Sequence, residues 1–173
     1  MNKNITKGFT LIEFMVMIAV LIIVIAVAAP QFNRLQASIE ADQVTGTLTS
    51  LLTESRTHAF IHRKRLGICA SHDGETCDAH AWNEGVLIYH DKTANRLHDP
   101  HEPIHKYMRL DLKHGSLEWR GYGLKNNILF QPDTGMPRGS NGSFLYCASE
   151  PKNSRKIIMG DMGNPRFIKG SCV

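Results

Sequence analysis

The sequence predicts an α+β protein in which one long N-terminal helix packs on antiparallel β-sheets. Three observations lead to this fold class: an apolar run near the N-terminus, an amphipathic repeat directly after it, and short β-type runs separated by turn residues over the rest of the 173-residue chain. We divide the chain into a leader (residues 1–8), a membrane-spanning helix (9–29), an amphipathic helix that enters the soluble domain (30–62) and a β-rich globular domain (63–173).

The leader, MNKNITKG, is polar and basic and directly precedes the apolar run. From Phe9 to Ala29 every side chain except Thr10 and Glu13 is apolar, which is about the 20 residues that a helix needs to cross a bilayer core. A secretory signal carries its small-residue cleavage site after the apolar stretch, whereas the candidate here, Gly8, lies before it. Cleavage at Gly8 would therefore leave the apolar helix attached to the protein.

The motif KGFTLIE, followed by an apolar run and a proline, resembles the class III signal and N-terminal helix of type IV pilins and type II secretion pseudopilins. This resemblance implies the pilin fold. It also implies that a prepilin peptidase cuts between Gly8 and Phe9 and methylates the new amino terminus of Phe9. Glu13 and Pro30 then match the positions where the family carries its carboxylate and, often, a helix-breaking proline.

Glu13 is a carboxylate one turn inside the apolar run. A carboxylate in the hydrocarbon core costs roughly a few kcal/mol on insertion scales, so it persists only if it finds a partner. The amino group of a neighbouring subunit's Phe9 is the partner that we expect. Near the helix start Glu13 can also satisfy unpaired N–H groups and interact with the positive end of the helix dipole. Glu13 is therefore interpreted as an assembly residue.

The helix is expected to continue beyond the membrane. Pro30 lacks the N–H that would bond the carbonyl of Ala26, which predicts a kink at the membrane exit rather than a stop. Gly46 costs about 1 kcal/mol relative to Ala in a helix and marks either a close packing contact or a hinge. Apolar or small residues recur at helical spacing to about residue 62 and predict a stripe that packs on the globular domain: Leu35, Ile39, Val44, Leu48, Leu51, Leu52, Ser55 and Ala59.

From residue 65 onward, β-type runs alternate with segments rich in Gly, Pro, Asn and Asp. The runs cover residues 65–70, 85–90, 106–112, 116–121, 127–131, 143–148, 155–160 and 166–170. Their short length and frequent turn signals predict antiparallel sheets.

The four cysteines, Cys69, Cys77, Cys147 and Cys172, all lie beyond the apolar run. An even number in a membrane-tethered domain indicates disulfides in an oxidising compartment. We favour the pairs Cys69–Cys77 and Cys147–Cys172, although four cysteines allow three connectivities and the sequence excludes neither of the other two. Because leader lysines hold the N-terminus in the cytoplasm, we expect a single-pass inner-membrane protein with a periplasmic soluble domain. The resemblance to pilins implies that it later enters the extracellular pilus.

Four blocks in the soluble part resemble, in order, the FimU/FimT minor pilins and the GspH pseudopilins: LLTESRTHAFIHRKRLGICAS, WNEGVLIYHD, ILFQPDTGMPRGSNGSFLYCA and RKIIMGDMGNPR. The positions that match the group's pattern are Glu54, Arg56, Trp82, Gly85, Phe130, Pro132 and Gly135. The cysteines and the ending at Val173 favour a pilus component over a secretion pseudopilin, which stays an alternative. The resemblance implies a minor pilin that joins other minor pilins in a tip or priming complex and connects it to the major pilin of the shaft. Pilus assembly, twitching motility and DNA uptake would then depend on it.

A second function implied by the resemblance is DNA capture. FimT-like members are implicated in DNA capture during natural transformation through a C-terminal motif of the form Gly-Arg-x-Arg. In the corresponding stretch, GNPRFIKG, Gly163 and Arg166 match, but Asn164 stands where the first arginine would be. Arg166 and Lys169 are the candidate contacts, and we expect at most weak, non-specific DNA binding.

Catalytic and metal-dependent functions find little support. The serines lack a nucleophile-elbow context and no Gly-rich phosphate loop precedes a helix signal. The stretch HDPHEPIH places His98, His101 and His105 with Asp99 and Glu102 at a spacing that can ligate a metal. Its two prolines leave the rings without a fixing helix or strand, so we interpret it as a solvated loop. We expect no enzyme activity, no cofactor and no metal site.

Overall fold

The computed structural model describes residues 9–123, 126–170 and 172. The chain divides into two compact units, Met1–Gln36 and Ala37–Val173. The helix α1 (Leu11–His62) contributes its first part to one unit and its second part to the other. The leader residues 1–8, including the proposed cleavage residue Gly8, lie outside the described residues.

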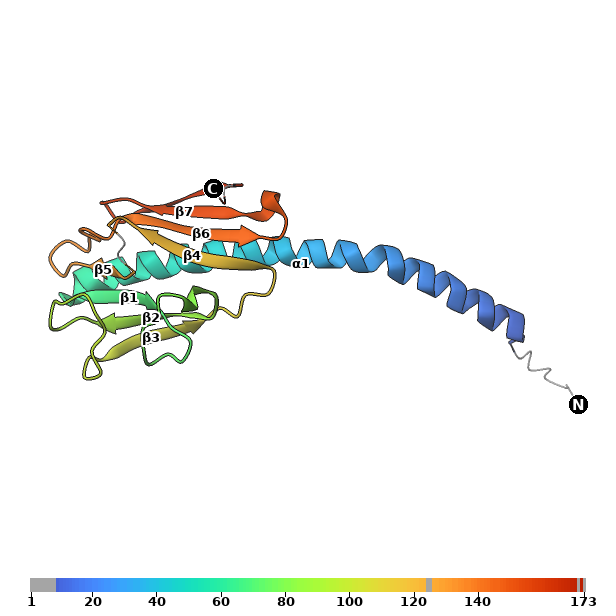
Figure 1. Ribbon diagram of the computed structural model, residues 1–173, viewed down its shortest axis with the longest axis horizontal. Helices are drawn as coiled ribbons and strands as arrows, with labels where there is room; N and C mark the ends of the chain where they lie inside the picture. The colour runs from blue at the N-terminus through green and yellow to red at the C-terminus, as the bar shows by residue number, and fades with distance from the viewer. Residues whose placement is uncertain (1–8, 124–125, 171, 173) are drawn as a thin grey trace, which may run out of the picture. The chain divides into compact units, whose positions relative to one another are not determined.

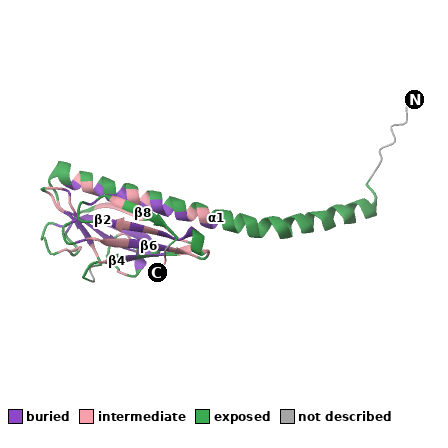
Figure 2. Cartoon of the chain, turned by 90° about the horizontal axis from the view of Figure 1, so that it is seen from above, coloured by how far each residue is buried: buried purple, intermediate pink, exposed green. Residues whose placement is uncertain are grey.

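The described part of the first unit is the apolar part of α1. Its side chains from Phe9 to Gln36 are all exposed, as the uniform colour of this segment in Figure 2 shows. By length and composition α1 can cross a membrane. The helix continues through Pro30 without a break, because a proline removes one backbone hydrogen bond and leaves the remaining bonds to hold the flanking turns.

The second unit contains two four-stranded antiparallel sheets. The first sheet has the order β3-β2-β1-β5, with β1 (Leu66–Ala70), β2 (Gly85–His90), β3 (Ile104–Arg109) and β5 (Ile128–Phe130). The second has the order β4-β6-β7-β8, with β4 (Gly115–Gly121), β6 (Gly142–Ala148), β7 (Arg155–Met159) and β8 (Pro165–Lys169). Two short 3₁₀ helices, η1 (Ala81–Asn83) and η2 (Pro151–Asn153), connect strands. In Figure 1, β1 to β3 run along one side of the second part of α1 and β4, β6 and β7 along the other.

The hydrophobic core of this unit lies between α1 and the two sheets. The buried side chains of α1 form one stripe at three- and four-residue steps: Ala37, Ala41, Val44, Thr45, Leu48, Leu51, Leu52, Ser55 and Ala59. Leu35 and Ile39, which the sequence placed on this stripe, are 56% and 47% exposed. That part of the prediction is wrong because both lie two residues from Ala37, which turns them about 200° away from it on a helix.

The prediction of an α+β protein with a long N-terminal helix on antiparallel sheets is confirmed. The third strand differs from its expected range, residues 106–112, because it ends at Arg109. Leu110 N–H then bonds the carbonyl of Glu84 at 2.8 Å, and Asp111 takes a positive φ of 46°, which ends the ladder. A methyl group added at Gly46 would meet no atom within 4 Å, so no close packing contact within this chain requires that glycine.

Candidate functional site

The first functional segment is the start of α1. Thr10 precedes the first helical residue, and its backbone N–H and its hydroxyl both donate to Glu13 Oε2 at 2.8 Å. In return, Glu13 N–H donates to Thr10 Oγ1 at 3.4 Å. This reciprocal arrangement is a capping box, in which the N-cap residue and the third helical residue satisfy each other's backbone donors. Glu13 therefore has a local partner within its own chain, and Phe9 beside it is exposed.

Glu40 joins the second part of α1 by hydrogen bonds to the β3–β4 connection and to β6. Its carboxylate accepts hydrogen bonds from the backbone N–H of Lys113 at 2.9 Å, from that of His114 at 3.0 Å and from the Tyr146 hydroxyl at 2.8 Å. Burial acts to raise the pKa of Glu40, but the hydrogen bonds from Lys113, His114 and Tyr146 together outweigh it and hold the pKa below its usual value. Nothing in the sequence pattern singled out this residue.

Two ion pairs join α1 to the sheets as well. Arg155 on β7, whose side chain is 6% exposed, donates to Asp42 Oδ1 at 2.9 Å. Lys106 on β3 pairs with Glu54 at 3.0 Å, and both of these side chains are partly exposed. The Arg155–Asp42 contact is the more significant of the two, because a buried guanidinium without its partner is costly whereas exposed pairs contribute little.

Both favoured disulfides are present in the structure. Cys69 on β1 is bonded to Cys77, and Cys147 on β6 is bonded to Cys172. The first closes the loop after β1, where Asp73 Oδ1 accepts the N–H groups of both Glu75 and Thr76 at 2.8 Å.

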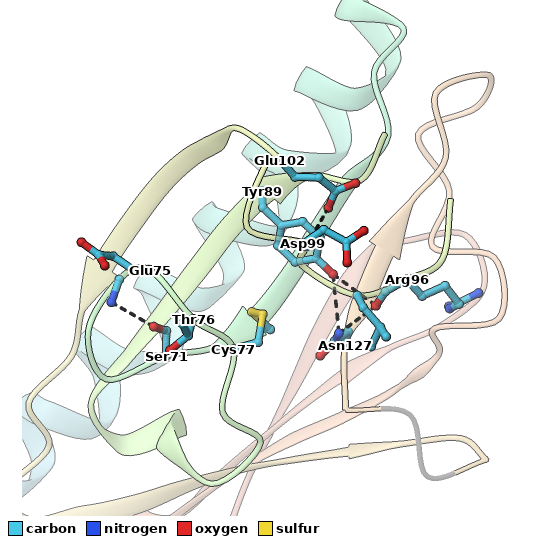
Figure 3. The surroundings of a disulfide bond; sticks show 12 residues. Ser71, Glu75, Thr76, Cys77, Tyr89, Arg96, Asp99, Glu102 and Asn127 are labelled. Carbon is cyan, nitrogen blue, oxygen red and sulfur yellow. Dashed lines mark hydrogen bonds between the residues drawn. A yellow bond between two sulfur atoms is a disulfide. The ribbon is translucent and has the colours of Figure 1, made fainter. Parts of the chain in front are cut away.

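Polar side chains from β2 and from the residue before β5 hold the loop after β2 beside the first disulfide. Figure 3 shows Asn127 and Tyr89 turned toward Arg96, whose carbonyl accepts from Asn127 Nδ2 at 2.8 Å and from the Tyr89 hydroxyl at 3.2 Å. Burial raises the pKa of Tyr89, so its hydroxyl stays a donor. Glu102, which is also labelled in Figure 3, accepts the backbone N–H groups of Lys92 at 2.7 Å and Asp99 at 3.2 Å.

The C-terminal basic residues do not form one patch. Arg166 and Lys169 are both exposed on β8, but they are three positions apart on a strand, so their side chains point to opposite faces of the sheet. Asn164, which occupies the place of the missing arginine, is exposed, and its Oδ1 accepts a hydrogen bond from the guanidinium of Arg56 on α1. Gly163 has a positive φ of 73° and packs against Pro137 and Arg56.

The histidines fall into a different arrangement from the loop site that their spacing suggested. The carboxylates of that loop are engaged locally, since Asp99 Oδ2 accepts from Asn95 at 2.9 Å and Glu102 accepts backbone N–H groups. His98 packs on the Tyr89 ring with centroids 4.9 Å apart. Among the described residues, no group of three or more His, Cys, Asp or Glu side chains is placed to hold a metal ion.

His105 instead belongs to a cluster with three other histidines. Its ring centroid lies 4.2 Å from that of His58 and 5.6 Å from that of His90, and His58 lies 4.2 Å from His62. The available signal in the sequence was the spacing of His58 and His62, which puts them on one face of a helix. The other two members, His90 and His105, lie on strands and follow His62 by 28 and 43 residues. Short-range sequence patterns do not reveal neighbours at such separations.

The combination of a membrane-compatible helix with a capped carboxylate in its first turn and a β-rich unit built around the continuation of that helix defines a pilin-like class of protein. Residues 44–163 match the family model described as type II transport protein GspH. This match covers more than half of the 173 residues, and the chain belongs to the GspH family.

Two crystal structures of the type IV minor pilin FimU from Pseudomonas aeruginosa have a similar fold. The first is 15% identical, covers 80% of this chain and 90% of FimU, and gives a TM-score of 0.50. The second, from another crystal form, is 15% identical, covers 76% and 91%, and gives a TM-score of 0.48. At this identity the likeness establishes the fold alone. Among curated proteins no match is found.

Proposed function

We propose that this protein is a minor pilin of a type IV pilus, a structural subunit that joins other minor pilins in a tip or priming complex and connects that complex to the major-pilin shaft. The observation that carries the proposal is an exposed apolar helix with a single carboxylate in its first turn, continued into a globular unit of FimU-like fold. Such a protein serves pilus assembly directly. Twitching motility and DNA uptake depend on it through the pilus.

In this proposal a prepilin peptidase removes residues 1–8, cuts between Gly8 and Phe9, and methylates Phe9. The helix then holds the subunit in the inner membrane, with the globular unit in the periplasm. The two disulfides support that location, because disulfides persist in oxidising compartments. On assembly the subunit leaves the membrane and enters the extracellular pilus.

Glu13 has two successive partners in this account. In the membrane it is satisfied by Thr10, through hydrogen bonds that end on Oε2. In the filament its carboxylate accepts the charged amino terminus of a neighbouring subunit's Phe9, in an apolar surrounding that strengthens the ion pair. The capping box lowers the free-energy cost of holding the Glu13 carboxylate in the membrane before assembly, and the intersubunit ion pair favours the assembled filament.

A type II secretion pseudopilin is the second candidate, and the description of the matched family as a type II transport protein favours it. DNA capture is less supported. The side chains of Arg166 and Lys169 point to opposite faces, and Asn164 is engaged with Arg56, so the loop does not offer the paired arginines of the capture motif.

The experiment that tests the proposal separates the charge of Glu13 from its capping role. Glutamine at the third helical position still completes a capping box but carries no charge. We therefore expect Glu13→Gln, like Glu13→Ala, to leave the protein abundant in the inner membrane and to remove it from sheared pili. Thr10→Val, which removes the side-chain partner and keeps the charge, is the matched control and should be incorporated.

Immunoblots of the membrane and sheared-pilus fractions measure both outcomes. Normal incorporation of Glu13→Gln, or equal loss of Thr10→Val from pili, would show that helix capping and not the charge is required. Recovery of the wild-type protein only with a secretion apparatus and never with pili would favour the pseudopilin alternative.

A further inference from the structure

A hollow of about 480 Å³ lies at the end of the globular unit where α1 ends. The residues that line it are Lys64, Arg65, His90, Asp91, Lys92, Pro103 and Pro132. They come from four segments: the connection between α1 and β1, the end of β2, the residue before β3 and the turn after β5. The register brings these segments together, because Leu66 at the start of β1 is paired with His90 of β2 and with Phe130 of β5.

The lining is cationic. The lining contains three cationic side chains, Lys64, Arg65 and Lys92, and one carboxylate, Asp91. Its net charge is therefore about +2 when His90 is neutral. Lys64 and Lys92 are exposed, and neither makes an ion pair with any residue that the structure describes. Cations from separate segments that outnumber the one carboxylate of the lining create a positive potential in the hollow.

The lining also contains buried polar atoms that have no hydrogen-bond partner in the described part of the chain. They are Arg65 Nε, His90 Nδ1 and Asp91 Oδ1, and Asp91 is only 2% exposed. Leaving such an atom unsatisfied costs about 1–3 kcal/mol, so native structures rarely do it without a ligand or ordered solvent. Of these three atoms, Arg65 Nε is a donor and suits an anion, a neutral His90 Nδ1 can donate or accept, and Asp91 Oδ1 only accepts.

We propose that this hollow binds a phosphate group, either as free phosphate or as the phosphate monoester of a larger ligand. A phosphate monoester carries a charge of about −1.5 to −2 at neutral pH, which balances the lining charge, and its three oxygens match several donors. The guanidinium of Arg65 fits a phosphate with two parallel N–H groups, and the lysines act as point charges. Pro103 and Pro132 provide apolar walls for the carbon part of an ester.

The histidine cluster behind the hollow makes this binding dependent on pH. Burial lowers the pKa of His90 most, and the nearby charges of Lys64 and Lys92 and the His105 and His62 imidazoles lower it further. His90 is therefore neutral at neutral pH, whereas an anion in the hollow favours its protonated form. Binding then takes up a proton, so affinity rises as pH falls.

Several groups face this cluster from the elements packed around it. They are Glu54, His58 and His62 from α1, Lys64 from the following segment, Asp91 and Lys92 after β2, and His105 and Lys106 from β3. Glu54 is paired with Lys106 at 3.0 Å. Asp91 is the carboxylate in the lining that opposes the added charge, and the buried Glu102 carboxylate adjoins the lining at Lys92, whose backbone N–H it accepts at 2.7 Å.

The test is a calorimetric titration of the full-length chain in uncharged detergent micelles with inorganic phosphate. Saturable binding is expected, and Lys64→Ala or Lys92→Ala should each weaken it about tenfold, because each removes a charge-assisted contact. Lys169→Ala on β8 removes the same charge at a residue that does not line the hollow. It is the matched control and should bind phosphate as the wild type does. Melting temperatures of the variants verify that each is folded.

Sulfate tests the proton linkage, because its charge stays constant between about pH 6 and pH 8, the range in which histidine titrates. Its affinity should rise toward pH 6 in the wild type and should lose most of this dependence in His90→Gln. A duplex oligonucleotide and a phosphorylated sugar are run in parallel to separate phosphodiester from monoester ligands. No phosphate binding, equal binding by Lys64→Ala and Lys169→Ala, or binding of the duplex alone would each overturn the proposal.

Discussion

At the scale of single residues, Glu40 joins three parts of the globular unit that are far apart in sequence. Its carboxylate receives two backbone N–H groups from the β3–β4 connection and the hydroxyl of Tyr146 from β6. Lys113 is exposed, whereas His114 is partly buried and Tyr146 is fully buried, so the bonds from the last two residues need Glu40 most. Glu40 therefore orients α1 along the sheets through hydrogen bonds rather than through apolar contact.

We expect Glu40→Ala to lower the free energy of unfolding by about 1–3 kcal/mol, because it removes the acceptor of two donors that are at least partly buried, the His114 N–H and the Tyr146 hydroxyl. Glu75→Ala, at an exposed position, is the matched control and should change stability little. The pKa of Glu40 is lowered in the folded state, so its contribution is present above the ordinary glutamate pKa and is lost as pH falls through the lowered value. Denaturation curves measured at several acidic pH values should therefore show a weaker pH dependence in the variant, and an unchanged slope would contradict this role.

Asn164 shows how one residue changes the interpretation of a motif. From the sequence it was the place where an arginine of the DNA-capture motif is missing. In the structure its side chain is bonded to Arg56 of α1 and holds the loop before β8 against the helix. An arginine at this position would face another guanidinium, so restoring the motif by one substitution would not restore its geometry.

At the scale of elements, the two disulfides close loops of different length. Their cysteines are separated by 8 and 25 residues, respectively. In the chain-entropy model, bridges of these lengths stabilise by about 2.5 and 3.5 kcal/mol, because the longer loop removes more freedom from the unfolded chain. The longer bridge also ties β6 to the residues that follow β8.

Variants that keep one bridge each test this difference within a single sequence. Reduction of Cys69→Ala/Cys77→Ala opens only the Cys147–Cys172 bridge, and reduction of Cys147→Ala/Cys172→Ala opens only the short one. We expect the loss in free energy of unfolding on reduction to be about 1 kcal/mol larger in the first variant. Equal losses, or a larger loss from the short bridge, would show that local packing around the cysteines outweighs loop closure.

At the scale of the whole molecule, the regular elements could be predicted from sequence because each is determined by short-range patterns. The β-type runs at 85–90 and 143–148, bounded by turn residues, located β2 and β6, and the helical repeat located α1 to His62. The division into two sheets could not be predicted, since strand order depends on contacts such as β1 with β5 that join distant segments.

The candidate site, like the fold, could be predicted from the sequence only in part. Glu13 and the cysteine pairs were accessible because composition or spacing marks them in the sequence. Glu40, the Arg56–Asn164 contact and the hollow beside His90 were not, because their partners are separated from them by long stretches of chain. Those contacts arise only when the two sheets pack on α1.

The central claim is that this protein is processed as a pilin and enters the filament, and intact-mass and N-terminal peptide spectrometry of protein from sheared pili tests it most directly. Removal of a basic leader before an apolar helix leaves that helix on the mature protein. The account therefore predicts a chain that begins at Phe9 and is heavier by one methyl group than the bare sequence. A chain that begins at Met1, or one that begins beyond Ala29, would contradict it.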